Sequence, residues 1–268
     1  MRGEAILIVM DIEIYKEAVD FLLTFDSITK KDINEHLTPR DNKPKDLKVI
    51  YNRLCFHAKN ANMKVNVIGD IERLRPVLFD FDPFRVANEY DIRDDDKLLN
   101  EIENSIRQKI RREKQSIWPK YCKTLIESAY FLKSFDTAEK FYEWTDFFTN
   151  NYLAKPALPF LINSEIYGYG FALACDFLKE LGFVEYGKPD VHLKDIFTEL
   201  KLIDNDSKSI EIKILRALDK IANANQVTSY NVDKIFWLIG SGDFYRTNKK
   251  IGSQKDNFIQ KIKEKYLI

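Results

Sequence analysis

Two glycines and one aspartate in IYGYGFALACDFLKELGFVEYGKPDVHLKDIF, residues 166–197, have the types and spacing to bind an anion and act beside it. Gly168 and Gly170 permit positive φ angles and a close approach of the backbone to a ligand. The helix expected from Phe171 adds unpaired N–H groups and the positive end of its dipole, so turn and helix together suit a phosphate. Asp190 follows Gly170 by twenty residues and supplies a carboxylate at the start of another helix.

Each feature also has an ordinary structural explanation. A G-x-G pair is most often a tight turn, and an aspartate just before a helix most often serves as its N-cap. A catalytic interpretation of Asp190 therefore needs more than its position before a helix.

The elements that would position these residues are helices. Leu99, Ile102, Ile106 and Ile110 recur at 3- and 4-residue steps in a charged segment, which predicts an amphipathic helix. Further helices are predicted over 12–25, 46–59, 119–133, 138–150, 171–181, 191–200, 208–222, 230–239 and 255–266. Ser27 and Asp136 are the expected N-caps of helices over ITKKDINEHL and TAEKFYEW. The one β signal is MKVNVI at 63–68.

The composition is that of an ordinary globular chain. Of 268 residues, 45% are hydrophobic and 31% charged, which argues against disorder. Lys+Arg and Asp+Glu are both 42, so the net charge identifies no partner. Basic residues outnumber acidic ones seven to one over 107–123 and seven to two over 246–265, whereas 80–103 has nine acidic and three basic residues. Such runs favour nucleic acid only slightly, because solvated helix faces also produce them.

No pattern indicates a metal site, a disulfide framework or a membrane segment. The three cysteines, Cys55, Cys122 and Cys175, are widely spaced and form no CxxC pair. The three histidines, His36, His57 and His192, show no ligand spacing among themselves. The apolar run in MRGEAILIVMDIEIYKEA is too short to span a bilayer and has no cleavage site. We therefore expect a cytoplasmic protein without a metal or a membrane partner.

The stretch around the two glycines resembles the helix-hairpin-helix DNA glycosylase superfamily, the endonuclease-III-like enzymes. The family pattern is an apolar residue, a G-x-G hairpin, a helix, and an aspartate followed two residues later by histidine; here these are Ile166, Gly168, Gly170, Asp190 and His192. YNVDKIFWLIGSGDFY, 230–245, resembles the family's later tryptophan helix, and WPKYCKTLIESAYFL, 118–132, more distantly resembles the helix before the hairpin. The resemblance covers about residues 80–245.

The resemblance implies a site on duplex DNA. The hairpin 166–171 would bind the DNA backbone through its amides, often with a monovalent cation beneath it. Asp190 would be the catalytic carboxylate, which stabilises the positive charge that builds on the deoxyribose and orients the attacking water. The base must first be flipped out of the stack. The expected DNA-binding residues are Tyr167, Gly168, Tyr169, Gly170, Phe171, Ala172, Lys188, His192 and Lys194.

Two departures from the family pattern narrow the expected activity. Bifunctional members carry a lysine two residues past the second hairpin glycine, where this chain has Ala172, and alanine forms no Schiff base. Many relatives bind an iron–sulfur cluster through four cysteines after the tryptophan helix, whereas GDFYRTNKKIGSQKDNF, 242–258, has none. We therefore expect a monofunctional glycosylase without a cluster.

Aromatic residues are the candidates for holding a flipped base. Trp118 and Tyr121 are the proposed stacking surfaces, with a place in a helical core as the alternative. A core position is favoured for Trp144 and Trp237, and GSG at 240–242 is interpreted as a helix C-cap. The pattern does not identify the base that is removed.

The sequence thus predicts a mainly α-helical protein with a helix-hairpin-helix glycosylase domain over 76–268 and a helical extension over 1–75. The extension is compatible with a winged helix-turn-helix or with helices that pad the main domain. The expected partner of the chain, as a monomer, is double-stranded DNA. The alternative function is that of a non-enzymatic DNA-binding protein in which Asp190 is only a helix cap.

Overall fold

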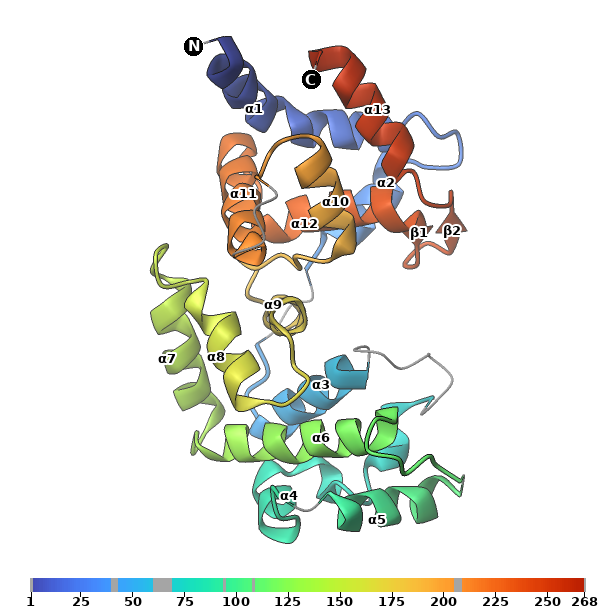
Figure 1. The fold of residues 1–268 in the computed structure, drawn as a ribbon, viewed down its shortest axis with the longest axis vertical. Coiled ribbons are helices and arrows are strands. Elements are labelled where there is room, and N and C mark those ends of the chain that lie inside the picture. Colours follow the sequence, from blue (N-terminus) through green and yellow to red (C-terminus); the bar gives the residue numbers. More distant parts are fainter. Residues whose placement is uncertain are drawn as a thin grey trace. The chain divides into compact units, whose positions relative to one another are not determined.

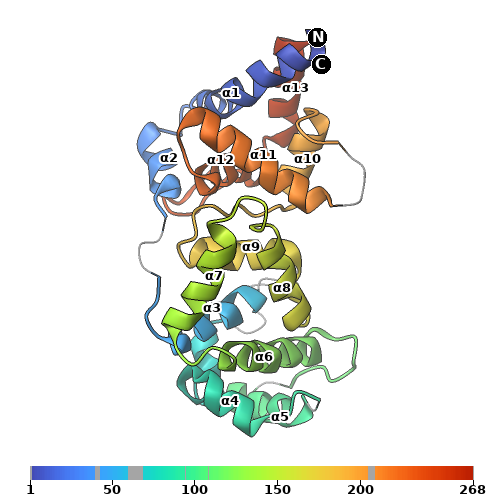
Figure 2. The same cartoon turned by 90° about the vertical axis from the view of Figure 1, so that its left-hand side faces the viewer.

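The computed structural model describes residues 2–39, 43–59, 69–93, 95–107, 109–204 and 209–267 (Figures 1 and 2). Over these ranges the fold is mainly α, with a minimal two-stranded sheet. The helices are α1 (Arg2–Leu22), α2 (Lys30–Leu37), α3 (Leu47–Lys59), α4 (Pro83–Glu89), α5 (Asp96–Ile106), α6 (Ile117–Lys133), α7 (Ala138–Thr149), α8 (Ala157–Glu165), α9 (Phe171–Glu180), α10 (Val191–Glu199), α11 (Ile210–Asn225), α12 (Ser229–Ser241) and α13 (Lys255–Tyr266). Two short 3-10 helices cover Ile71–Leu74 and Phe79–Phe81, and β1 (Asp243–Phe244) pairs antiparallel with β2 (Lys249–Lys250).

The chain divides into two compact units. The terminal unit comprises Met1–Asp41 and Leu178–Ile268, and the central unit comprises Asn42–Phe177. This division differs from the predicted boundary near residue 75. The segment 1–75 is shared because α2 packs on α12 in the terminal unit, whereas α3 packs on α6 in the central unit. The α2 helix belongs to the terminal unit and α3 to the central unit, and the predicted strand at 63–68 lies outside the described residues. The winged helix-turn-helix therefore stays a prediction.

The terminal unit is built around α12, which α1, α2, α10, α11 and α13 all contact. Figure 1 shows the blue N-terminal helices beside the orange and red C-terminal ones. Phe236 of α12 lies at the centre, with ring centroids 5.1 Å from Phe197 of α10 and 6.1 Å from Phe258 of α13. Gly242 ends α12 with a φ of +64°, and its N–H donates to the Leu238 carbonyl at 2.9 Å, which confirms the predicted C-cap.

The central unit is built around α6. Figure 2 shows α6 with α3 and α8 on one side and α4 and α5 on the other, and all four contact it. The predicted amphipathic helix is confirmed, because α5 buries Leu99, Ile102 and Ile106. It ends at Ile106, since Arg107 adopts a left-handed φ of +52°, and Ile110 is buried outside the helix.

Two N-caps differ from the predicted ones. Thr29, not Ser27, caps α2, and it forms a reciprocal capping box with Asp32. Thr137, not Asp136, caps α7 by accepting a hydrogen bond from the Lys140 N–H at 3.3 Å. In both cases the capping residue lies closer to the first helical turn than the predicted one, so its side chain reaches the free N–H groups.

Two helices, α4 and α8, lie outside the predicted ranges. Each has a proline at or just before its first residue. Proline indicates a break in a sequence, but it is tolerated at the start of a helix, where an N–H would have no intrahelical partner. Pro83 opens α4 after the Asp82 cap, and Pro156 directly precedes α8.

All three cysteines, Cys55, Cys122 and Cys175, are buried free thiols. Burial raises the pKa of Cys55 and of Cys122 well above the ordinary value of a thiol. Within the described ranges, no helix is long and apolar enough to cross a membrane.

The contact between α10 and α12 predicts the effect of Gly240→Ala. A Cβ at Gly240 would lie 2.5 Å from the Cγ and 2.6 Å from the Cβ of His192, so one helix must shift. We expect a loss of about 1–3 kcal/mol in the free energy of unfolding, measured by urea denaturation. Helix propensity alone would instead raise the free energy of unfolding by about 1 kcal/mol, because alanine favours a helix more than glycine does. Such a gain would contradict the close packing of α10 on α12.

Candidate active site

The predicted hairpin is present as a tight turn between α8 and α9 in the central unit. Gly168 has a φ of +72°, a conformation that favours glycine. The Tyr169 N–H donates to the Ile166 carbonyl at 3.1 Å, which closes the turn. The Gly170 carbonyl then accepts the first helical hydrogen bond of α9, from the Ala174 N–H at 3.0 Å.

The outer surface of the hairpin is open. Tyr167, Gly168 and Gly170 are exposed, whereas the side chains of Tyr169 and Phe171 are buried and anchor the turn. Apart from Gly170 and its two chain neighbours, no heavy atom of the described residues lies within 4 Å of the position of a Cβ on Gly170. A ligand can therefore approach the backbone at the N-terminus of α9, where free N–H groups and the helix dipole favour an anion.

One face of α6 holds the hairpin in place. The Thr124 hydroxyl lies 2.8 Å from the Tyr167 carbonyl oxygen, and the Glu127 carboxylate accepts the Tyr167 N–H. Lys123 places its ammonium 4.6 Å from the centre of the Tyr167 ring. Thr124 and Glu127 are three residues apart on α6, so both face the same side of the helix. The sequence analysis did not identify Thr124 and Glu127 as residues that hold the hairpin. Their spacing of three residues indicated only that they share one face of a helix.

Asp190, in the terminal unit, is the N-cap of α10. Its Oδ1 accepts hydrogen bonds from the N–H groups of His192 at 2.9 Å and Leu193 at 3.3 Å. Its Oδ2 makes no hydrogen bond with any other residue in the described ranges. The carboxylate is therefore fixed through one oxygen, while the other remains available to water or a ligand.

A buried ion pair lies close to Asp190. Lys179 of α9 and Asp233 of α12 are 4% and 1% exposed, and their Nζ and Oδ2 atoms are 2.7 Å apart. The chain reaches Asp190 by passing directly over Asp233, because a Cβ on Gly187 would lie 2.9 Å from the Asp233 Cβ. The other oxygen of Asp233, Oδ1, is buried without a hydrogen-bond partner in the described part of the chain.

These surroundings raise the pKa of Asp190 above its ordinary value of 3.8. Burial is the largest cause, and the negative charge of Asp233 adds to it. The hydrogen bond from the Leu193 N–H and the electrostatic influence of the His192 and Lys188 side chains lower this pKa in part. A carboxyl with a raised pKa next to a second carboxylate is a common property of catalytic sites.

The other predicted DNA-binding residues have different surroundings. The His192 ring packs against Gly240, and its Nδ1 is buried with no hydrogen-bond partner among the described residues, so packing is its observed role. Lys188 is half-buried, and Lys194 is exposed. Ala172 follows the hairpin in the first turn of α9 and is half-buried; the next lysine on this helix is Lys179, which is paired with Asp233.

The two proposed base-stacking residues lie inside the central unit. Trp118 and Tyr121 are 6% and 4% exposed, with ring centroids 6.4 Å apart, and the Tyr121 hydroxyl donates to the Cys55 carbonyl at 3.0 Å. These contacts belong to the packing of α6 on α3. They favour the alternative core position, and base stacking by either ring stays a prediction.

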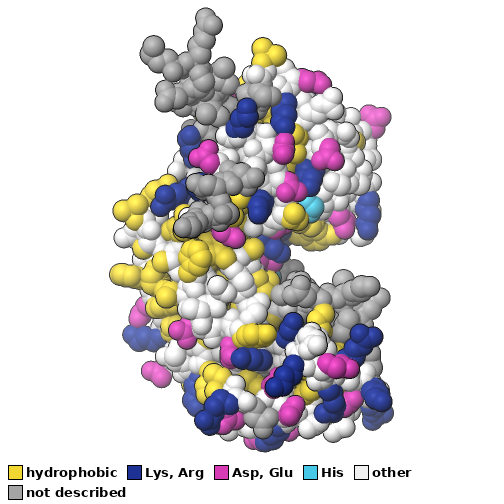
Figure 3. All heavy atoms as spheres, in the orientation of Figure 1, with side chains coloured by type: hydrophobic (Ala, Val, Ile, Leu, Met, Phe, Trp, Pro, Cys, Tyr) yellow, Lys and Arg dark blue, Asp and Glu magenta, His cyan; other side chains and the backbone are white. Residues whose placement is uncertain are grey.

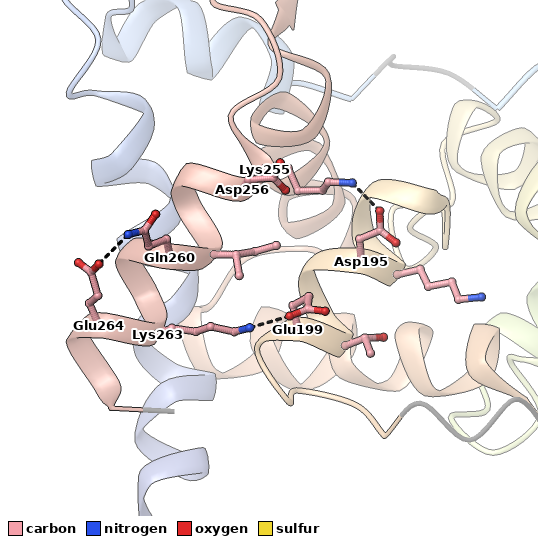
Figure 4. A pocket seen from close by; sticks show the side chains of 10 residues that line it. Asp195, Glu199, Lys255, Asp256, Gln260, Lys263 and Glu264 are labelled. Carbon is pink, nitrogen blue, oxygen red and sulfur yellow. Dashed lines mark hydrogen bonds and ion pairs between the residues drawn. The ribbon is translucent and has the colours of Figure 1, made fainter.

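A cavity of about 560 Å³ lies between α10 and α13 in the terminal unit (Figure 4). Lys255 pairs with Asp195 across it, and Lys263 pairs with Glu199 at 2.6 Å. Lys194 also lines the cavity. Two lysines and two carboxylates thus pair across the cavity, and the other charged side chains of its lining, Lys194, Asp256 and Glu264, are of both signs. The described residues also contain no group of three or more His, Cys, Asp or Glu side chains that could hold a metal ion.

The fold is similar to that of a solved structure from the helix-hairpin-helix glycosylase superfamily. It is the crystal structure of Methanocaldococcus jannaschii 8-oxoguanine glycosylase/lyase in complex with a 15mer DNA containing 8-oxoguanine. The match has a TM-score of 0.52 and 18% sequence identity, and it covers 89% of this chain and 99% of that chain. No family model matches the sequence, and no curated protein matches it. The predicted resemblance is thus confirmed at the level of the fold.

The buried pair predicts a large effect of Lys179→Met, because Asp233 would keep a buried charge without this partner. We expect a loss of about 3–5 kcal/mol in the free energy of unfolding, measured by urea denaturation. The double variant Lys179→Met/Asp233→Leu should recover most of it, since both charges are removed. Lys263→Met is the matched control, because its pair with Glu199 is exposed and contributes about 0–1 kcal/mol. Equal losses in the two single variants would contradict this role of the buried pair.

Proposed function

We propose that this chain, which has the fold of a helix-hairpin-helix DNA glycosylase, hydrolyses the N-glycosidic bond of a damaged or modified base in duplex DNA. The observation that carries the proposal is Asp190, a fixed carboxylate with a raised pKa, twenty residues after an open G-x-G hairpin in a chain of this fold. The hairpin binds the DNA backbone, and Asp190 acts at the deoxyribose of the flipped nucleotide.

The geometry at Asp190 suits the charge that develops during the reaction. Breaking the bond between base and sugar builds positive charge on the deoxyribose, and a preorganised carboxylate stabilises it. Because Oδ1 is held by two N–H groups of α10, Oδ2 faces the sugar or orients the attacking water. The carboxyl must be ionised for this, so activity rises with pH through the raised pKa of Asp190.

The residue after the hairpin supports hydrolysis without strand cleavage. The matched enzyme is described as a glycosylase/lyase. This chain has Ala172 where lyase members of the family carry their lysine, and no amine on the first turn of α9 can attack the sugar. The proposed product is therefore an intact strand with an abasic site.

No step of the reaction depends on a cofactor. A monovalent cation beneath the hairpin would be held by carbonyl oxygens of the turn. The Tyr167 carbonyl is already engaged by the Thr124 hydroxyl, which lies 3.2 Å from a Cβ position on Gly168. In this structure the Thr124 hydroxyl therefore occupies one position next to the Tyr167 carbonyl that a cation would otherwise use.

One observation favours a second function, that of a DNA-binding protein without catalysis. Asp190 makes the hydrogen bonds of an ordinary N-cap, which such a protein would also need. The two functions differ in the consequence of Asp190→Asn, because asparagine caps a helix as well as aspartate but carries no charge.

We expect Asp190→Asn to lower base release by about a hundredfold or more, because the charge that stabilises the transition state is lost. Duplexes that each carry one altered base are incubated with protein, and strand lengths are compared with and without hot alkali. The wild-type protein should give cleavage only after alkali, with a rate that rises with pH. Cleavage before alkali would exclude a monofunctional enzyme. Duplex binding without any base release, unchanged in Asp190→Asn, would favour the second function.

Gly170→Asp should weaken duplex binding roughly tenfold or more at 0.1 M salt, because it places a negative charge at the phosphate site. Gly170→Ala is the matched control, since its Cβ carries no charge and meets no described residue other than its chain neighbours within 4 Å. Fluorescence anisotropy of a labelled duplex measures both. Equal affinities of the two variants would exclude the hairpin as the phosphate site.

A further inference from the structure

A second cavity, of about 400 Å³, opens beside the hairpin in the central unit. We name it the α6 groove. Five cationic side chains line it: Arg93, Arg112, Lys114, Lys120 and Lys123. Two carboxylates, of Asp95 and Asp96, are also present, and Tyr167 of the hairpin forms part of the lining. In Figure 3 basic and acidic side chains both appear over the part of the central unit that α5 and α6 form.

Three of the five cations already have partners within the protein. Arg93 pairs with Asp91 at 3.1 Å, Arg112 pairs with Glu103, and Lys123 lies 3.7 Å from Glu127. Lys114 and Lys120 are exposed, and neither side chain makes a hydrogen bond or ion pair with the described residues. The groove therefore presents two lysines without a partner among the described residues, beside the carboxylates of Asp95 and Asp96 that also line it.

The position of these lysines relative to the hairpin is set by α6. One face of α6 carries side chains that lie three, four or seven positions after Lys120: Lys123, Thr124 and Glu127. Thr124 and Glu127 bind the backbone of Tyr167, and Lys123 lies against its ring. The face of α6 that fixes the hairpin thus also carries one of the two unpaired lysines, while Lys114 lies just before α6.

We propose that the α6 groove is a second phosphate-binding site, which holds the backbone of the same duplex beyond the nucleotide bound by the hairpin. The ligand is a phosphodiester of duplex DNA. Each strand of a duplex carries a negative charge about every 3.4 Å along the axis, so a backbone bound at the hairpin brings further phosphates to adjacent protein surface. This inference rests on the proposed binding of duplex DNA by the hairpin.

The salt dependence of binding tests the groove, because each phosphate neutralised by a lysine steepens the slope of log affinity against log salt by about 0.9. Fluorescence anisotropy of a labelled, unmodified duplex is measured over a series of salt concentrations. Lys114→Gln and Lys120→Gln should each flatten the slope by about 0.9 and weaken binding roughly eightfold at 0.1 M salt. The double variant should show about twice the change in slope.

Lys140→Gln is the matched control. Lys140 is an exposed lysine on α7 of the same unit, outside the groove, and its partner is Glu143 at 2.8 Å. Its slope should equal that of the wild-type protein. A control slope as flat as that of the groove variants would overturn the groove as a specific site. Thermal unfolding of every variant checks that the fold is kept.

Two further outcomes separate this inference from the proposed function. If the duplex binds and Gly170→Asp weakens it, while the lysine variants keep the wild-type slope, the groove proposal is overturned and the hairpin stands. If the wild-type protein binds no duplex, the proposed function is overturned and the groove proposal with it.

Discussion

The buried ion pair between Lys179 and Asp233 fixes the end of α9 against α12, and the position of Asp190 depends on it. Burying a charged side chain is costly unless a partner of opposite charge lies close to it. Lys179 and Asp233 each supply that partner for the other. The chain then crosses α12 at Gly187, whose missing Cβ leaves room for Asp233, and reaches Asp190 three residues later. The pair thus places the Asp233 carboxylate near Asp190, where its charge adds to the effect of burial on the pKa of Asp190.

The same arrangement has a cost in stability. Because the pKa of Asp190 is raised in the folded protein, the folded state binds this proton more tightly than the unfolded state. The contribution of Asp190 is favourable below its unfolded value of 3.8 and is lost as the pH rises through the raised pKa. Asp32 behaves oppositely, since its bonds to Lys249 and Thr29 lower its pKa. The site therefore opposes the ionisation of Asp190 that the proposed reaction requires.

Some local features were predictable from the sequence, whereas contacts between distant segments were not. Hydrophobic periodicity located α5, and the aspartate before α10 was placed correctly at its N-cap. The division into units was missed, because α2 and α3 are near in sequence but pack on partners far along the chain. Asp233 gave no signal either, since its partner Lys179 is 54 residues away and each alone resembles an ordinary surface charge.

The exposed surface of the central unit also carries apolar side chains whose exposure could not be predicted from the sequence. Phe147, Tyr152, Leu153, Phe160 and Leu161 are exposed, and Figure 3 shows apolar side chains gathered over α7 and α8. Periodicity alone would assign such side chains to a core, because it records which residues share a face and not whether that face is covered. Lys114 and Lys120 look like ordinary surface lysines in the sequence. Only the fold shows that both line one cavity with Tyr167 of the hairpin.

The burial of the three thiols has a chemical consequence. Peroxides attack the thiolate, not the protonated thiol, and burial keeps Cys55 and Cys122 protonated while Cys175 is shielded from solvent. The folded chain therefore presents no reactive sulfur from these residues to oxidants, the same agents that modify bases in DNA. An introduced surface cysteine would then be the single reactive position for a dye or a cross-linker.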